Sequence, residues 1–325
     1  MERRINHIHF QITRNCNLRC AFCGQWGKKG FFSDISGEEM TFSDWENIVN
    51  QLESYRKKEG ISPLVTVWGG EPLVSPFFDK IMLLLKRKGF ETEVITNGVL
   101  ICNHLEVLTN CADKIYVSVD GTKEIHDAIR GNGVYDKVMD NLKKLRHKNV
   151  TVMSVITKKL TENLPIFLKE LNELNICELF LQDMIGLSSS EVIEYKNTMK
   201  DFFGINADFI DSWENNEKIN FSDELKKALA KIDQNALNYK VIHKKHSYDK
   251  TMICKSPFTH PHIAWNGEVI YCTDFYDFSA GNVKREGLEN IFLNEKSEIF
   301  RQIIENGKCT SCNHCSWRGS ISNLV

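Results

Sequence analysis

Three cysteines lie close together near the start of the chain, in the stretch TRNCNLRCAFCG. They are Cys16, Cys20 and Cys23, with the spacing C-x3-C-x2-C. Thiolates so close in sequence ligate a metal ion or an iron–sulfur cluster. A structural zinc site needs four closed ligands, and no histidine stands at a fitting offset beside these three thiols. Three thiolates on a 4Fe-4S cubane leave one iron open for a substrate or cofactor, so the spacing favours such a cluster.

A second group of cysteines lies in the last quarter of the chain. Its members are Cys254, Cys272, Cys309, Cys312 and Cys315. The chain has 11 cysteines, an odd number, and a reducing compartment would not hold them as disulfides. Ligation is therefore the expected use of both groups. Three further cysteines, Cys102, Cys111 and Cys177, stand alone and are expected to be small buried hydrophobic residues.

Charge and hydropathy exclude several classes of protein. The 325 residues include 41 basic and 43 acidic side chains, for a formal net charge of -2. Such a balance provides no general attraction to nucleic acid or to an anionic membrane. No apolar run approaches the roughly 20 residues of a membrane span, and the first ten residues lack the apolar segment of a secretory leader. We expect a cytoplasmic protein with neither nucleic acid nor membrane as a partner.

Strand and helix patterns alternate through the first 185 residues. Short apolar or alternating runs predict six strands, each followed by an amphipathic helix pattern, at 5–13, 64–68, 91–96, 114–119, 149–156 and 178–183. Ser43 and Glu46 fit a capping box at the start of the first helix. Six βα units imply a parallel sheet with right-handed crossovers, either doubly wound or curled into a barrel.

The rest of the chain lacks this alternation of strand and helix patterns. Residues 186–250 are polar and are expected to form a helical bridge, and residues 251–325 are expected to form a small C-terminal domain after the first domain of residues 1–185. Asn266-Gly267 predicts a hairpin with a two-residue type I′ turn. Histidines of these two regions are expected at the polar surface or in hairpin packing rather than as metal ligands: His243, His246, His260 and His262.

The N-terminal cysteine loop carries a family resemblance. With Phe22 between the second and third cysteines, directly after a predicted first strand, it resembles the signature of the radical S-adenosylmethionine (SAM) enzymes. The resemblance implies a 4Fe-4S cluster held by the three cysteines, with SAM on the open iron and Phe22 beside the cofactor. It also implies a partial (β/α)6 TIM-like barrel with a small C-terminal α+β domain.

Later motifs agree with this resemblance. The stretch WGGEP after the second strand is similar to the family's glycine-glycine-glutamate-proline motif. By that resemblance, Gly69, Gly70, Glu71 and Pro72 hold the methionine part of SAM, with the glutamate on its ammonium group. Two glycines make physical sense here because their backbone can approach a ligand without an intervening Cβ.

Polar residues also follow the third and fourth strands. The resemblance places Asn97 of TNG, together with Ser118 and Asp120 of SVDG, against the ribose and carboxylate of SAM. The stretch HDAIRGNG resembles a continuation found in relatives with C-terminal cluster domains, and it places Arg130 near the SAM carboxylate. All these segments come at the carboxyl ends of predicted strands, where α/β sheets and barrels assemble their sites.

The C-terminal cysteines resemble the SPASM and Twitch extensions of radical SAM proteins, which carry one or two auxiliary clusters. No cysteine follows the last pair, which precedes Trp317 and Arg318, so one auxiliary 4Fe-4S cluster of Twitch type is expected. Its expected ligands are Cys254, Cys272, Cys312 and Cys315. Cys309 is not among these four ligands. Three roles are open for it: it replaces Cys312 as a ligand, it is inert, or it acts catalytically by giving a hydrogen atom to a substrate radical. Zinc is the alternative metal for four such thiolates.

The resemblance implies an enzyme that receives an electron from a donor such as flavodoxin or ferredoxin. It cleaves SAM to methionine and a 5′-deoxyadenosyl radical, which abstracts hydrogen from a substrate. Because the cysteine loop begins at residue 16, no room is expected for an N-terminal leader-binding domain, which favours dehydrogenation or epimerisation of a small natural product or sugar-like molecule. Modification of a ribosomally made peptide, by cross-link, thioether or epimerisation, is one alternative. A non-catalytic iron–sulfur or zinc protein is the other.

Overall fold

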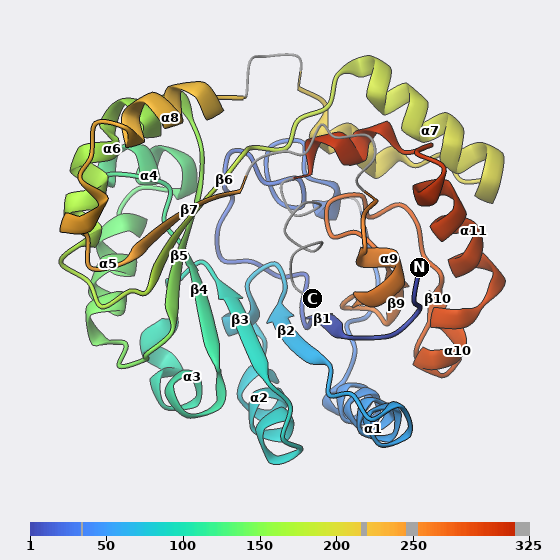
Figure 1. Ribbon diagram of the computed structural model, residues 1–325. Coiled ribbons are helices and arrows are strands. Elements are labelled where there is room, and N and C mark those ends of the chain that lie inside the picture. The colour runs from blue at the N-terminus through green and yellow to red at the C-terminus, as the bar shows by residue number, and fades with distance from the viewer. Residues whose placement is uncertain (34, 216–219, 245–252, 316–325) are drawn as a thin grey trace.

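The computed structural model describes residues 1–33, 35–215, 220–244 and 253–315, and at its centre lies one ten-stranded sheet. Seven parallel strands follow chain order from the middle of this sheet to one edge: β1 (His7–Gln11), β2 (Leu64–Trp68), β3 (Thr92–Thr96), β4 (Lys114–Ser118), β5 (Val150–Val155), β6 (Glu178–Gln182) and β7 (Lys240–Lys244). Figure 1 shows them as an open arc with helices outside it. The expected partial barrel is confirmed.

Helices cover the convex side of the arc. They are α1 (Phe42–Glu59), α2 (Phe78–Arg87), α3 (Leu105–Cys111), α4 (Lys123–Arg130), α5 (Val134–Lys144) and α6 (Lys158–Leu171). The main core lies between these helices and the strands. Phe10 of β1, for example, packs against Trp45 of α1 with ring centroids 5.1 Å apart, and neither side chain is exposed. Burial of such apolar side chains is what holds the helices on the sheet.

The first helix begins two residues earlier than the sequence predicts. Its capping box is formed by Thr41 and Asp44: the Asp44 N–H donates to Thr41 Oγ1, and the Thr41 N–H donates to the Asp44 carboxylate at 2.8 Å. The prediction of Ser43 and Glu46 is therefore wrong. Both pairs fit the sequence pattern, but the earlier start places Phe42 against Phe77, with ring centroids 6.4 Å apart.

The range 186–250, expected to be a helical bridge, contains α7 (Ser189–Phe203), α8 (Ser222–Leu229) and also the strand β7. β7 pairs with β6 in parallel, from Glu178 opposite Lys240 to Gln182 opposite Lys244. It thus adds a seventh strand to the barrel. The sequence did not reveal it because an edge strand with lysines at both ends lacks a clear apolar pattern.

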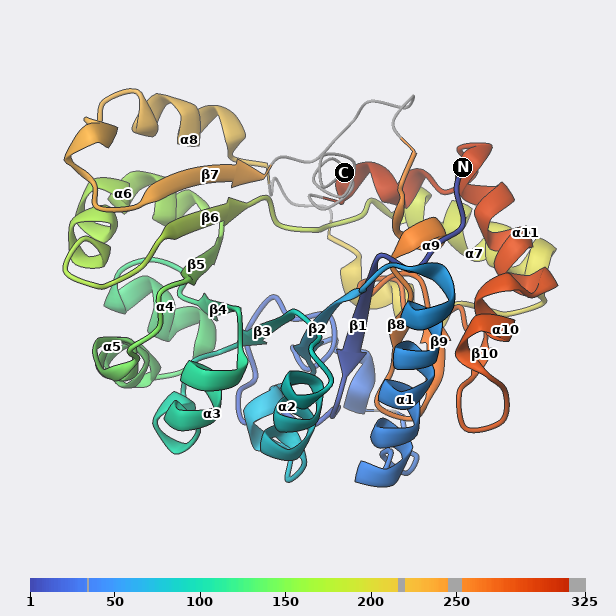
Figure 2. The same cartoon turned by 60° about the horizontal axis from the view of Figure 1, so that its bottom comes forward.

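The C-terminal region extends the same sheet on the other side of β1. Its strands are β8 (His262–Ile263), β9 (Glu268–Ile270) and β10 (Gly281–Asn282), and its helices are α9 (Ser256–Thr259), α10 (Leu288–Leu293) and α11 (Glu295–Glu305). β8 pairs with β1 in parallel, whereas β9 pairs antiparallel with β8 and β10. Figures 1 and 2 both show this region beside the β1 edge of the arc. None of the helices in the described part of the chain is long and apolar enough to cross a membrane.

The predicted hairpin is present, but its turn differs from the predicted type I′ turn. The Ala264 N–H donates to the Glu268 carbonyl, which leaves a loop of three residues, and the Gly267 N–H donates back to the Ala264 carbonyl. Gly267 has a φ of 92°, whereas Asn266 has a negative φ. A type I′ turn needs positive φ at both central residues, and the longer loop lets Trp265 bury its ring completely.

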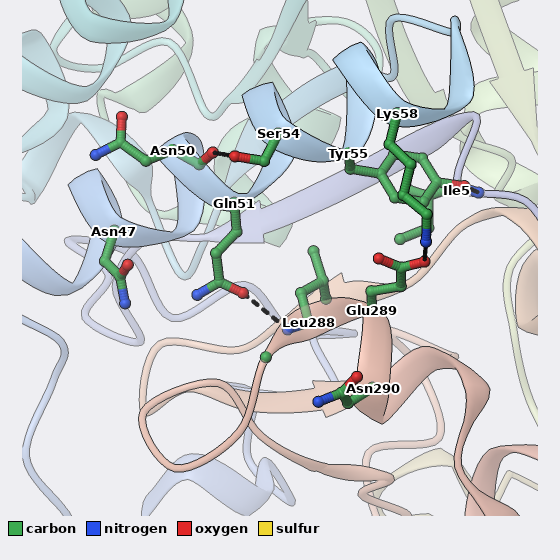
Figure 3. Close-up of a pocket in the computed structure, with 11 residues that line it drawn as sticks. Ile5, Asn47, Asn50, Gln51, Ser54, Tyr55, Lys58, Leu288, Glu289 and Asn290 are labelled. Atoms are coloured by element: carbon green, nitrogen blue, oxygen red, sulfur yellow. Dashed lines mark hydrogen bonds and ion pairs between the residues drawn. The ribbon is translucent and has the colours of Figure 1, made fainter.

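Polar contacts join α1 to α10 on the outside of the molecule. Gln51 Oε1 accepts a hydrogen bond from the Leu288 N–H at 2.8 Å, and Lys58 forms an ion pair with Glu289. Figure 3 shows these side chains crossing from one helix to the other beside a hollow of about 440 Å³. None of the residues expected to do chemistry lines this hollow, which we interpret as part of the junction between the barrel and the C-terminal region.

The rings of four histidines pack together where the C-terminal region meets the barrel. The ring centroids of His7 and His9 lie 4.3 Å apart. The centroid of His9 lies 4.2 Å from that of His262, and the centroid of His7 lies 5.0 Å from that of His260. In the described residues, no three His, Cys, Asp or Glu side chains are arranged to hold a single metal ion. Burial lowers the pKa of all four histidines, that of His260 to about 4. His246 lies outside the described residues.

We expect these histidines to make the fold acid-sensitive. Their folded-state pKa values lie below the unfolded value near 6.5, so the unfolded chain binds more protons in that interval. The free energy of unfolding is therefore complete above about pH 6.5 and decreases as the pH falls, by up to about 1.4 kcal/mol per pH unit for each histidine. Urea unfolding at pH 7, 6 and 5 measures this slope. The double variant His9→Gln/His262→Gln should have a shallower slope than the wild-type protein. Equal slopes for the two proteins would contradict the prediction.

Candidate active site

A cavity of about 300 Å³ lies where the cysteine loop meets the carboxyl ends of the barrel strands. Most of the residues predicted to bind the cofactor and cluster line it: Cys16, Cys20, Phe22, Cys23, Gly69, Gly70, Glu71, Asn97, Ser118 and Arg130. Two predicted residues, Pro72 and Asp120, are buried but do not line it. The structure therefore brings together side chains from four separate strand ends at one point.

The cysteine loop is shaped by its own backbone and sulfur atoms. The Cys23 N–H donates to the Cys20 carbonyl at 3.1 Å, and the Leu18 and Trp26 N–H groups point at Cys16 Sγ and Cys23 Sγ, at 3.4 and 3.3 Å. Burial raises the pKa of Cys16 to about 12 and also raises that of Cys20. The bare thiols thus keep their protons at neutral pH, and a cationic partner is needed to stabilise the thiolates, as an iron–sulfur cluster would.

Gly69 and Gly70 press directly against this loop. The Gly70 N–H donates to the Thr13 carbonyl at 2.9 Å, and the Glu71 N–H donates to the Asn15 carbonyl at 2.8 Å. A Cβ at Gly69 would lie 2.5 Å from Thr13 O, and a Cβ at Gly70 would lie 2.3 Å from Arg14 O. The chain's own contacts therefore require the two glycines, which corrects the explanation that only ligand approach requires them.

The Glu71 carboxylate is held in place from three directions. Oε1 accepts hydrogen bonds from Thr96 Oγ1 at 2.7 Å and from the Leu73 N–H at 3.1 Å, and Oε2 accepts one from the Asn97 N–H at 2.6 Å. Burial raises its pKa to about 7, although these hydrogen bonds act in the opposite direction. A carboxylate has about four acceptor positions, so one remains for an ammonium group. Pro72 follows as the first residue of a 3-10 turn, Pro72–Val74, which Glu71 caps.

Arg130 comes from the end of α4 and reaches the cysteine loop. Its Nε donates to Asp120 Oδ2 at 2.6 Å, and its Nη1 lies 3.9 Å from Cys20 Sγ. Asp120 Oδ1 accepts a hydrogen bond from the Val155 N–H. The structure therefore places Asp120 behind Arg130, where it orients the guanidinium, rather than in the cavity where the resemblance placed it. Asn97 donates from Nδ2 to Asn17 Oδ1 at 2.8 Å.

Two acidic positions in the cavity wall were not singled out from the sequence. Asp183 follows β6, and its carboxylate accepts from Ser222 Oγ at 3.0 Å and lies 3.3 Å from His243 Nε2 of β7. Its position directly after a strand is the same signal that marked Asn97. Asp274, two residues after Cys272, also lines the cavity, and burial raises its pKa to about 6.

Trp213 joins the cavity wall from the end of the 3-10 helix η4 (Asp208–Trp213). Its ring lies so close to Gly24 that a Cβ there would fall 2.3 Å from a ring carbon, and its indole N–H donates to the Asp274 carbonyl. One side chain thus connects the cysteine loop to the C-terminal region. No local sequence pattern marked Trp213, because its position depends on how the segment after α7 folds back.

The five C-terminal cysteines gather at a second point. Cys312 Sγ lies 3.4 Å from Cys309 Sγ, and Cys309 Sγ lies 3.1 Å from Ser311 Oγ. Cys254 and Cys272 lie within electrostatic reach of Cys312, and Cys315 lies within reach of Cys272. Five thiols are therefore available where one cubane takes four. Trp317 and Arg318 lie outside the described residues.

Electrostatics at this second point also favour a cationic occupant. The hydrogen bond with Cys309, followed by burial, raises the pKa of Cys312, and burial raises that of Cys272. Cys309 lines a hollow together with Cys254 and Cys312, and it is not among the residues that line the cavity of the cysteine loop. This position associates Cys309 with the other four thiols rather than with a substrate in that cavity.

Two family models match the chain. The radical SAM superfamily model matches residues 10–170, and the SPASM model, an iron–sulfur cluster-binding domain, matches residues 254–316. The first range includes the cysteine loop, the GGEP motif and Arg130. The second includes all five C-terminal cysteines, so the tail is an iron–sulfur domain, and the zinc alternative loses its support.

Two curated relatives match this chain over most of their own length. A Pyrococcus furiosus protein named "tungsten-containing aldehyde ferredoxin oxidoreductase cofactor-modifying protein" is 24% identical over 97% of this chain and 88% of its own. The "AdoMet-dependent heme synthase" of Methanosarcina barkeri is 24% identical over 94% of this chain and 88% of its own.

Among solved structures, SuiB of Streptococcus suis bound to S-adenosylmethionine has a TM-score of 0.70. It is 15% identical and covers 99% of this chain, which spans 75% of the SuiB chain. The enzyme anSMEcpe with bound AdoMet has a TM-score of 0.60 at 18% identity, over 93% of this chain and 81% of its own. At these identities the likeness shows the fold alone, a partial barrel with a C-terminal domain.

We expect Gly70→Ala to disrupt the N-terminal cluster site. The added Cβ would overlap the backbone of Arg14 and Asn15 and displace the loop that carries Cys16. Anaerobically reconstituted protein should lose about four irons, the content of one cubane, while it keeps the auxiliary cluster. The matched control is Gly287→Ala, where a Cβ would meet nothing nearer than 3.8 Å at a φ of -69°. Full iron content in Gly70→Ala would show that this contact does not position the loop.

Cys309→Ala tests the choice of auxiliary ligands. If Cys254, Cys272, Cys312 and Cys315 hold the cluster, the variant keeps its full iron content, whereas Cys312→Ala loses about four irons. Iron and sulfide analysis of the anaerobic proteins measures both. Loss of a cubane from Cys309→Ala would identify Cys309 as a ligand and exclude our choice.

Proposed function

Because this chain belongs to the radical SAM superfamily and carries a C-terminal SPASM domain, we propose that it dehydrogenates a small polar natural product or sugar-like molecule. The chain is an enzyme of this superfamily, with SAM and 4Fe-4S clusters as its cofactors. When bound and reduced, the SAM-binding cluster and SAM supply a 5′-deoxyadenosyl radical that takes a hydrogen atom from the substrate. The cofactors carry this chemistry, and the protein binds, orients and excludes water.

Cys16, Cys20 and Cys23 would hold the SAM-binding cluster. The free acceptor position of Glu71 would receive the SAM ammonium group, and the Arg130 guanidinium, oriented by Asp120, would face the SAM carboxylate. These roles are supported by the convergence of the three cysteines, Glu71 and Arg130 on one cavity, and by the opposite charges of the Glu71 and Arg130 side chains.

Asn97 and Ser118 would contact the ribose. Both line the cavity at neighbouring strand ends, β3 and β4, and both carry groups that hydrogen-bond hydroxyls. Phe22 lies in the same lining and offers an apolar surface beside the cofactor. Pro72 contributes the turn that follows Glu71 rather than a contact in the cavity.

The observation that carries the choice of dehydrogenation is the composition of the cavity wall. Dehydrogenation needs a proton acceptor and an electron acceptor, whereas epimerisation needs a hydrogen-atom donor such as a thiol. Asp183 and Asp274 line the cavity, and among the described residues no cysteine outside the cysteine loop does. Asp183, paired with His243, would accept the proton. The auxiliary cluster, whose expected ligand Cys272 is two residues from Asp274, would accept the electron.

The same carboxylates favour a substrate with amine or hydroxyl groups, which they can bind by charge-assisted hydrogen bonds. The names of the P. furiosus and M. barkeri relatives refer to cofactor modification and haem synthesis, which supports a small molecule. Peptide modification is the second candidate. Support for it comes from the similar fold of SuiB bound to precursor peptide SuiA and of anSMEcpe with bound peptides.

The proposal predicts stoichiometric 5′-deoxyadenosine and a product that has lost two hydrogens. Anaerobic enzyme with SAM and dithionite or reduced flavodoxin is incubated with a panel of amino sugars and, separately, with synthetic peptides. Mass spectrometry measures both products. Conversion of peptides alone would favour the second candidate. A product that keeps the substrate mass in ordinary water and gains one deuterium in deuterated water would indicate epimerisation.

Asp183→Asn should lower substrate oxidation by about 100-fold while substrate-independent SAM cleavage stays unchanged, because general-base catalysis contributes at least that factor. Asp201→Asn, an exposed change on α7, is the matched control and should leave both rates unchanged. Wild-type oxidation rates in Asp183→Asn would remove this residue from the proton-acceptor role.

A further inference from the structure

One buried hydroxyl in the described chain has no role in the site so far. Tyr195 lies on α7, its side chain is 2% exposed, and its hydroxyl oxygen is fully buried without a hydrogen-bond partner in the described residues. Burial of an unpaired hydroxyl costs free energy, so an unpaired group of this kind points to a partner that is absent from the protein atoms.

The groups near this hydroxyl are Asp277 and the auxiliary thiols of Cys309, Cys272 and Cys312. The Tyr195 ring packs against Phe275, three residues after Cys272, with ring centroids 5.5 Å apart. The hydroxyl is therefore buried near the point where the cluster ligands gather.

The position of Tyr195 is fixed by contacts on either side of it along α7. Glu194 accepts a hydrogen bond from Thr310 Oγ1 at 2.8 Å, and Thr198 Oγ1 donates to the Lys308 carbonyl at 3.3 Å. Both partners flank Cys309 in sequence. α7 is thus attached to the segment that carries the last three cysteines, which keeps the helix position of Tyr195 beside them.

We propose that Tyr195 donates a hydrogen bond to a sulfur of the auxiliary cluster and raises its reduction potential. A hydrogen bond to a cluster sulfur stabilises the more negative, reduced state more than the oxidised state, and such bonds are among the factors that set these potentials. Sulfur that ligates iron as a thiolate is also a better acceptor than the neutral thiol. The proposal rests on the auxiliary cluster of the proposed function, and a raised potential suits that cluster to accept an electron released by dehydrogenation.

Asp277 is the competing acceptor. Its Oδ1 accepts from the Phe209 N–H at 2.8 Å, and its Oδ2 is buried without a partner although Tyr195 is nearby. The structure has no hydrogen bond between Tyr195 and Asp277, which favours the cluster as the partner of the hydroxyl. A hydroxyl bound to Asp277 is one outcome of the test below.

The test compares reconstituted wild-type protein with Tyr195→Phe, which removes only the hydroxyl. Iron analysis comes first: wild-type protein with about four irons instead of two cubanes' worth would reject the auxiliary cluster and the proposed function with it. With both clusters present, redox titration followed by electron paramagnetic resonance separates them, because only the N-terminal signal changes when SAM is added.

We expect the ratio of reduced to oxidised auxiliary cluster at a fixed potential to fall about tenfold in Tyr195→Phe, which is about 59 mV for a one-electron couple. The N-terminal cluster should not shift. Tyr239→Phe is the matched control, since it removes a buried hydroxyl that donates to the Leu168 carbonyl in the barrel. An unchanged auxiliary potential in Tyr195→Phe, as expected if the hydroxyl serves Asp277, overturns the proposal.

A second measurement applies if Tyr195→Phe does not retain the cluster. Electron–nuclear double resonance of the reduced wild-type protein in deuterated water should show an exchangeable deuteron coupled to the auxiliary cluster. Its absence from the wild-type spectrum would overturn the proposal without any variant.

Discussion

The contact between the GGEP turn and the cysteine loop is the constraint on which the rest of the site depends. Gly69 and Gly70 lie against the backbone of residues 13–15 at a distance that no side chain allows. The hydrogen bonds of the Gly70 and Glu71 N–H groups place Cys16 next to the ends of β2 and β3. From that position the loop shares one cavity with Glu71 and Arg130. The end of β2, the two glycines and the loop that carries the three thiols are thus held together by the backbone contacts of the chain itself.

A single continuous sheet relates this unit to the C-terminal cysteines. β8 pairs with β1, the strand that leads directly into the cysteine loop, so the hairpin before Cys272 extends the barrel rather than forming a separate sheet. Trp213 connects the two regions again, between Gly24 and the Asp274 carbonyl. Asp274 lines the cavity of the cysteine loop and lies close to Cys272, which is the physical basis of the proposed oxidation.

Many of the polar groups in the site are oriented by a second group from another element. Asp120 holds Arg130, Thr96 and the Asn97 N–H hold Glu71, and His243 pairs with Asp183. In each pair the residue that lines the cavity keeps one direction because its partner is buried beside it. Tyr195 differs because its hydroxyl has no such partner in the described chain, and for this reason we assign it to the cluster.

Local patterns in the sequence were sufficient for the six strands of the barrel, the three cysteines of the loop and the polar residues at strand ends, because spacing and periodicity are properties of neighbouring residues. The helix cap at Thr41, the three-residue hairpin loop and the strand β7 were decided by packing: Phe42 packs against Phe77, Trp265 is buried, and β7 needs β6 beside it. The same holds for Asp120 behind Arg130, Trp213 in the cavity and Tyr195 among the thiols. Such contacts join residues tens to hundreds of positions apart, and only the folded chain determines which of them meet.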